Sequence, residues 1–145
     1  MTMAIWKRKP DLALLEKSNQ GTLVAHVGIE FTEIGDDYLS ARMPVDERTI
    51  QPAGILHGGA SVVLAETLGS VASNLCVDEN QYCVGLDINA NHVRSAPKGS
   101  GYVYGTARPL HIGGSTHVWE ILLKNEAGKL VCVSRLTMAV LTHSR

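Results

Sequence analysis

The chain has 145 residues, of which 45% are apolar and 19% charged, and 13 Lys and Arg against 14 Asp and Glu give a net charge of −1. This length predicts a single domain over residues 1–145, and the apolar fraction excludes a disordered, solvated tail. A nearly neutral chain also lacks the basic surface expected of a protein that binds nucleic acid or an anionic membrane.

Turn residues and apolar patterns divide the chain into two helices and six strands. In chain order these are a helix at 11–18, strands at 26–31 and 38–44, a long helix at 60–77, and strands at 82–93, 101–111, 116–125 and 130–141. Short connections separate the last four strands, which predicts that they pair as antiparallel neighbours. The order is typical of an α+β fold in which an antiparallel sheet packs on one helix. Such a sheet has uncovered edges, which favours an oligomer.

The long helix at 60–77 carries one isolated charge. It is apolar nearly all round, which predicts a buried helix of about 27 Å. Glu66 is the only charged residue between positions 57 and 77, and Ser70 and Ser73 are expected on the same face. Because a buried carboxylate is costly without a partner, Glu66 is a candidate catalytic group. The alternatives are a buried ion pair or a helix face that is exposed after all.

The start of this helix is a candidate site for a carbonyl oxygen or an anion. His57, Gly58 and Gly59 stand where the helix begins, and the first turn leaves backbone N–H groups unpaired at an electropositive end. Alternatively, the glycines only permit a tight turn and His57 is a helix cap. Gly58 and Glu66 are eight residues apart, or about 12 Å along a helix, too far for one carbonyl to touch both. Either they serve different purposes, or Gly58 of one subunit faces Glu66 of another across a two-fold axis.

The remaining motifs are weaker. The six histidines lack metal-ligand spacing, so we expect no metal, and the chain has neither a phosphate-binding loop nor the serine elbow of α/β-hydrolases. Residues 89–94 are unusually polar for a strand. They are either an exposed edge or a strand end whose His92 and Arg94 bind phosphate.

Location is predicted from the N-terminus and the cysteines. The N-terminal charges precede no apolar signal region, and no stretch approaches the roughly 20 apolar residues of a membrane span. The cysteines, Cys76, Cys83 and Cys132, are too scattered for a disulfide framework. We therefore expect a cytoplasmic protein.

The sequence resembles the hot-dog fold acyl-CoA thioesterases of the 4-hydroxybenzoyl-CoA and phenylacetate-pathway type. It is most similar to the bacterial branch that contains 1,4-dihydroxy-2-naphthoyl-CoA thioesterase. The likeness covers nearly the whole chain, and its most specific part is LHGGASVVLAETLGS at 56–70. The resemblance implies a hot-dog fold, in which an antiparallel sheet wraps around one long central helix. It further implies a homodimer, paired again into a homotetramer, with active sites at the dimer interface.

The resemblance also assigns catalytic roles. By position, Glu66 matches the catalytic carboxylate of the family and Gly58 the backbone N–H that polarises the thioester carbonyl. Gln51 and His57 match residues that hold the thioester. Ser70 matches the hydroxyl that orients water or the carboxylate.

The predicted coenzyme A contacts come from the strand that follows the long helix. His92 and Arg94 fall where the family contacts coenzyme A. Three departures from the family pattern affect the acyl group and the coenzyme rather than the catalytic set. Ala53 replaces a common Phe, Ser115 replaces a common Arg, and the turn at 97–101 is about two residues longer.

The expected activity is hydrolysis of an acyl-CoA thioester, with an aryl acyl group, to a free acid and coenzyme A. Glu66 acts as nucleophile or general base, and no cofactor is needed. The substrate is acyl-CoA or an acyl or aryl carrier protein, and we expect neither nucleic acid nor membrane as a partner. The alternatives are a hot-dog dehydratase acting on 3-hydroxyacyl thioesters and a non-catalytic protein that binds acyl thioesters.

Overall fold

The computed structural model describes residues 3–144, which form three helices and six strands. The helices are α1 (Leu12–Asn19), α2 (Leu23–His26) and α3 (Gly58–Leu75). The strands are β1 (Glu30–Ile34), β2 (Leu39–Pro44), β3 (Gln81–His92), β4 (Tyr102–Ile112), β5 (Thr116–Lys124) and β6 (Leu130–Thr142). Both predicted helices and five of the six predicted strands are confirmed, with bounds within two residues of those expected.

The strand predicted at 26–31 is confirmed only for its last two residues, and β1 continues to Ile34. The chain instead forms α2, a single helical turn whose cap, Thr22, accepts a hydrogen bond from the Val24 N–H at 3.2 Å. Gly28 follows with a φ of +80°, a conformation that favours glycine and turns the chain toward the sheet. Strand β1 therefore begins only at Glu30.

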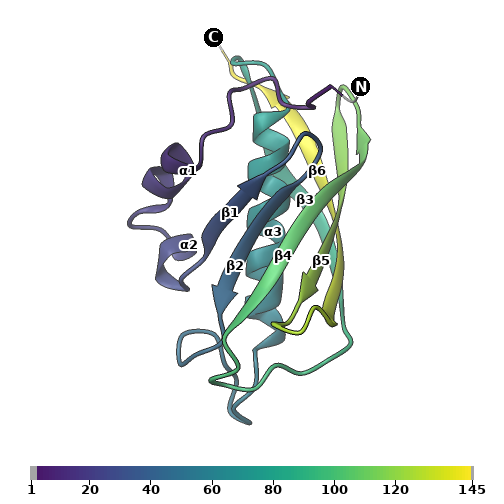
Figure 1. Ribbon diagram of the computed structural model, residues 1–145. Coiled ribbons are helices and arrows are strands. Elements are labelled where there is room, and N and C mark those ends of the chain that lie inside the picture. The colour runs from purple at the N-terminus through teal and green to yellow at the C-terminus, as the bar shows by residue number, and fades with distance from the viewer. Residues whose placement is uncertain (1–2, 145) are drawn as a thin grey trace.

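The six strands form one antiparallel sheet in the order β1-β2-β4-β5-β6-β3 (Figure 1). The predicted pairs β4–β5 and β5–β6 are confirmed, but the predicted pair β3–β4 is wrong because β3 pairs with β6. The connection from β3 to β4 runs along the loop before α3, where the Leu56 N–H donates to the Ala96 carbonyl at 2.8 Å. Strand β3 therefore occupies one edge of the sheet.

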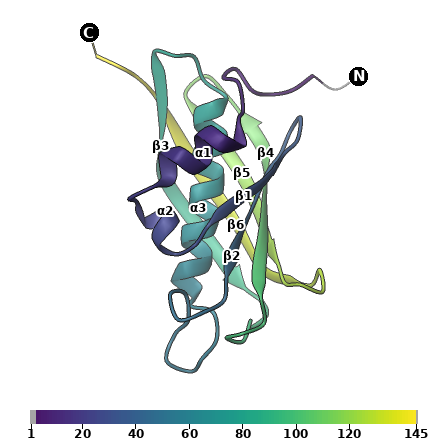
Figure 2. The same cartoon turned by 60° about the vertical axis from the view of Figure 1, so that its left-hand side comes forward.

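Helix α3 lies lengthwise on one face of the sheet (Figures 1 and 2). Its buried residues recur at spacings of three and four, as expected for one helix face, and are Ser61, Leu64, Ala65, Leu68, Gly69, Ala72 and Ser73. They join a core that includes Trp119 and Leu136 of the sheet. The opposite face of α3 is only half-buried, so the prediction of a helix buried all round is wrong for the single chain.

The N-terminal segment stands beside this half-buried face of α3. Helix α1 packs on β1 and α2 packs on α3 (Figure 2). The start of α1 is fixed by Asp11, whose carboxylate accepts a hydrogen bond from the Ala13 N–H at 2.9 Å. As a result, the two short helices supply one wall of a cavity along α3.

Candidate active site

The first turn of α3 presents a backbone donor without a partner. The His57 carbonyl accepts from the Ala60 and Ser61 N–H groups, and His57 Nδ1 accepts from the Gly59 N–H at 2.8 Å. Among residues 3–144 these bonds leave the Gly58 N–H free at the electropositive end of an 18-residue helix. His57 is therefore an exposed helix cap, one of its two predicted roles, and its bond satisfies the Gly59 N–H.

Four of the predicted site residues come together around this turn. Gln51, Gly58, His92 and Arg94 line a cavity of about 410 Å³. A Cβ at position 58 would lie 2.9 Å from His92 Nε2, so only glycine lets the imidazole approach the helix start so closely. Gln51 accepts a hydrogen bond from the Ala53 N–H through its side-chain oxygen, which fixes its amide beside the loop. The cavity holds donors and a cation, and no carboxylate lines it.

Glu66 lies two turns further along α3, on the half-buried face. Its Oε2 would be 2.8 Å from a Cβ at position 85, so the carboxylate rests against the bare backbone of Gly85 in β3. Within residues 3–144 Glu66 takes part in none of the four ion pairs, and its carboxylate accepts no hydrogen bond. A half-buried carboxylate without a partner is available to attack a carbonyl or to accept a proton.

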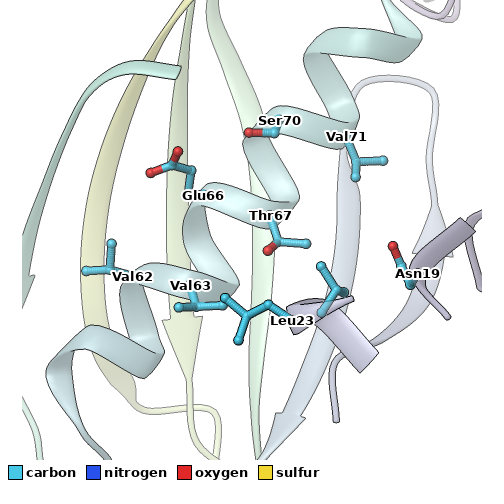
Figure 3. Close-up of a pocket in the computed structure, with 9 residues that line it drawn as sticks. Asn19, Leu23, Val62, Val63, Glu66, Thr67, Ser70 and Val71 are labelled. Atoms are coloured by element: carbon cyan, nitrogen blue, oxygen red, sulfur yellow. The ribbon is translucent and has the colours of Figure 1, made fainter. Parts of the chain in front are cut away.

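The surroundings of Glu66 are mostly apolar. They form a cavity of about 450 Å³ lined by Asn19, Leu23, Val24, Val62, Val63, Glu66, Thr67, Ser70 and Val71. Figure 3 shows Glu66 and Ser70 on successive turns of α3, with Val63 and Thr67 beside Leu23 of α2. Ser70 Oγ has only a weak contact of 3.8 Å with Met138 Sδ, so its hydroxyl is free to orient a water or the carboxylate.

The predicted site is thus divided between two cavities in one chain. No lining residue of the Gly58 cavity also lines the Glu66 cavity. Of the seven predicted residues, Glu66 and Ser70 line the cavity along the middle of α3, and four others line the cavity at its start. The seventh, His57, lines neither cavity and caps the helix. The division follows from the eight residues that separate Gly58 from Glu66 on a straight helix.

Ser73 does not line the Glu66 cavity, so the prediction that it shares a face with Glu66 and Ser70 is wrong. Its hydroxyl is fully buried on the sheet side, where it accepts from Trp119 Nε1 at 2.6 Å and lies 2.9 Å from His117 Nδ1. At about 100° per residue, Ser73 lies about 20° from Glu66 on the side of the buried Gly69, whereas Ser70 lies about 40° from Glu66 on the other side, so only Ser73 reaches the core. Burial lowers the pKa of His117 below its ordinary value of 6.5, so the imidazole stays neutral in this network.

The apolar wall formed by Leu23, Val24 and Asn19 was not predicted. These residues precede the sheet and follow no motif, and only their packing against α3 brings them to Glu66. Elsewhere in the described residues, no group of three or more His, Cys, Asp and Glu side chains is placed to bind a metal. None of the helices in the same part of the chain has the length and hydropathy of a transmembrane segment.

Comparison with known proteins identifies the family. Residues 53–132, which include the whole of α3, match the Thioesterase superfamily. The chain belongs to the thioesterase superfamily. This confirms the predicted thioester hydrolase and the predicted hot-dog fold.

Individual relatives cover almost the entire thioesterase chain. It is 56% identical to 1,4-dihydroxy-2-naphthoyl-CoA hydrolase from Escherichia coli over 137 residues, which are 94% of this chain and 99% of that protein. It is 50% identical to the proofreading thioesterase EntH from Cronobacter turicensis, over 94% of this chain and 98% of that protein. The crystal structure of a thioesterase from Haemophilus influenzae superposes with a TM-score of 0.92 at 47% identity, covering 95% of each chain.

Proposed function

We propose that this thioesterase hydrolyses an aryl-coenzyme A thioester at sites shared between two copies of the chain. The observation that carries the proposal is the arrangement of β3. Glu66 rests against Gly85 of this strand and Gly58 rests against His92 of the same strand. The carboxylate and the carbonyl-binding turn thus contact the same edge strand, at two positions that are seven residues apart.

Pairing of β3 with a second copy would bring these halves together. The edge is long and partly apolar, with Val84 41% and Leu86 62% exposed, and such an edge favours pairing with another strand. In an antiparallel pair centred on Asn89, Gly85 of one chain lies opposite His92 of the other, because the bulge between Gly85 and Asp87 adds one residue to the strand. Glu66 then meets the Gly58 turn of the partner, and a two-fold axis makes two such sites.

The reaction that this geometry supports is attack on a polarised thioester carbonyl. The Gly58 N–H, at the positive end of α3, stabilises the oxyanion that forms on the carbonyl oxygen. As nucleophile, a Glu66 oxygen bonds to the carbonyl carbon while the carbon–sulfur bond breaks, and water then hydrolyses the resulting anhydride. As general base, Glu66 instead takes a proton from the water that attacks. In both cases the coenzyme leaves as a thiolate, a good leaving group because thiols ionise at a pKa of about 8.5.

The other predicted residues have supporting roles in this proposal. Gln51 and His57 hold the thioester at the helix start, and Ser70 orients the attacking water or the carboxylate. His92 and Arg94, both exposed at the end of β3, bind the phosphates of coenzyme A. A carrier protein that presents the same phosphopantetheine thioester is a second substrate of the same class. No cofactor takes part in this chemistry.

Assembly and location complete the proposal. The dimer pairs again into a tetramer, and the protein acts in the cytoplasm. In support of a reducing compartment, Cys76, Cys83 and Cys132 are unpaired and buried.

A thiol-release assay tests the proposed activity. Benzoyl-CoA and an aliphatic acyl-CoA of similar size are each mixed with the wild-type protein, and free coenzyme A is measured with a thiol reagent. We expect faster release from the aryl thioester. A dehydratase or a binding protein frees no thiol, so an absence of release from both would contradict the proposal.

A further inference from the structure

The far wall of the Glu66 cavity contains a buried polar group without a partner. Asn19, the last residue of α1, is 8% exposed, and its side-chain Nδ2 has no hydrogen-bond acceptor among residues 3–144. Its backbone is satisfied, because its carbonyl accepts from the Thr22 N–H at 3.1 Å and from Thr22 Oγ1 at 2.6 Å. Burial of an amide donor with no acceptor is unfavourable, so the side chain requires an explanation.

Only one other side-chain atom in the described residues is buried and unpaired, and it differs from Asn19 in its setting. Arg42 Nε belongs to a guanidinium that forms an ion pair with Glu30 at 3.4 Å and stacks on the Tyr102 ring at 4.1 Å. Arg42 therefore has its charge compensated. The Asn19 amide has no such compensation, and it lies between two cavities, that of Glu66 and one of about 310 Å³ that is lined by Glu16, Glu30 and Arg48 among others.

Asn19 and Glu66 are separated such that one molecule bound in the cavity could contact both, each at a different end. In Figure 3, Glu66 and Asn19 stand at opposite ends of the group of lining residues, with Thr67 and Leu23 between them, and the Glu66 carboxylate points toward β3, away from Asn19. A thioester carbonyl at Glu66 would direct its acyl group across this apolar floor toward Asn19. The cavity volume of about 450 Å³ admits a group of the size of a substituted ring.

We propose that Asn19 is a specificity-determining residue whose Nδ2–H donates a hydrogen bond to a neutral oxygen at the far end of the acyl group. The inference rests on the proposed function and adds the residue that selects the substrate. The oxygen is neutral because Glu66 is the only charged side chain in the cavity lining and no cation there would pair an anionic substituent. The Nδ2 atom of Asn19 is itself shielded from solvent, so little water competes for this hydrogen bond, although Leu23 beside it is 57% exposed.

The test compares two acyl groups of equal size that differ only in this oxygen. Methoxybenzoyl-CoA and ethylbenzoyl-CoA, each substituted at the meta and at the para position, are assayed for thiol release. The ratio of their kcat/KM values is determined for the wild type and for Asn19→Leu, which keeps the branching and the number of side-chain heavy atoms and removes the amide. At the better ring position, we expect the preference for the methoxy group to fall about three- to tenfold in the variant. The rate with the ethyl compound should remain within about twofold.

A second variant keeps the inference testable if the leucine protein folds poorly. Asn19→Asp retains the shape of the side chain and removes the N–H donor, so it should lose the same preference for an acceptor oxygen. An unchanged methoxy-to-ethyl ratio in either folded variant would overturn the role of Asn19, as would an equal loss with both compounds. If the wild type releases thiol from none of the four thioesters, the proposed function itself fails. The two failures are therefore distinct.

Discussion

The two cavities along α3 differ in the chemistry that each can supply. The cavity at the helix start is lined by the donors and the cation of Gly58, His92 and Arg94, and by no carboxylate. The cavity along the middle of the helix is apolar, with Glu66 as its single charge. Hydrolysis of a thioester needs a donor for the carbonyl oxygen and a carboxylate for the attack, so each cavity holds half of an active site.

Removal of the carboxylate tests the second cavity and should have the largest effect. Glu66→Gln keeps the shape of the side chain but neither attacks nor accepts a proton, so kcat should fall by about 10² to 10⁴. Substrate binding should survive, as measured by isothermal titration with a non-hydrolysable thioether analogue. A variant that retains near wild-type kcat would remove Glu66 from the mechanism.

Removal of the cation tests the first cavity. Arg94→Ala should raise KM about tenfold and change kcat little, because a phosphate contact remote from the breaking bond contributes uniform binding. The matched control is a pantetheine thioester, which lacks the nucleotide and should be hydrolysed equally by both proteins. An equal KM increase with the truncated substrate would mean that Arg94 has a structural role.

Two serines of α3 distinguish its cavity face from its core face. Ser73→Ala removes the partner of Trp119 Nε1 and His117 in a fully buried network, so it should lower the free energy of unfolding by about 1–3 kcal/mol. Its kcat should be unchanged. Ser70→Ala should do the opposite, with kcat reduced several-fold and stability retained. Urea unfolding and thiol-release kinetics on both variants check the pair, and a loss of stability in both would show that the two faces are alike.

The pH dependence of stability follows from the same buried network. Burial lowers the pKa of His117, so as pH falls through 6.5 the unfolded chain takes up a proton that the native chain does not. The free energy of unfolding should therefore decrease below pH 6.5, by less than about 1.4 kcal/mol per pH unit from this group. Urea titrations between pH 5 and 8 measure this change, and stability that rises toward pH 5 would contradict a neutral buried imidazole.

Local patterns were sufficient to predict most of the fold. The spacing of apolar residues identifies α3, and turn residues delimit five strands to within two residues, because these signals act over short segments. The partner of β3 was not predictable in this way. The connection after it resembles a hairpin, yet its Ala96 and Pro97 are held by Leu56 and Ile55 of the loop before α3. The single turn of α2 is too short to show a helical period.

The candidate site was predictable where the polarity of one residue differs from that of its neighbours in the sequence. Glu66 is a lone charge in an apolar helix, and this alone identifies it. Asn19 and Leu23 carry no such signal, because a polar and an apolar residue near a turn are ordinary and only tertiary packing brings them to the cavity. The burial of the outer face of α3 was overestimated for a related reason. Its apolar residues fit burial, but the single chain does not cover them.

The central claim is that one active site draws Gly58 and Glu66 from different chains. It can be tested with two inactive variants, Glu66→Gln and Gly58→Pro. Proline removes the N–H donor at the first position of α3, where it is tolerated, and the extended His57 before it, with ψ of 132°, suits a following proline. Gly58→Ala is the matched control, because it adds the same Cβ beside His92 and keeps the N–H.

The measurement is the activity that returns when the two inactive proteins are unfolded, mixed and refolded together. In a mixed dimer one site combines the intact Gly58 of one chain with the intact Glu66 of the other, and the second site carries both lesions. Random mixing makes half of the dimers mixed, so roughly a quarter of wild-type activity should return. If each site drew both groups from one chain, every site would carry a lesion. An inactive mixture in which native mass spectrometry detects heterodimers would therefore contradict the shared site.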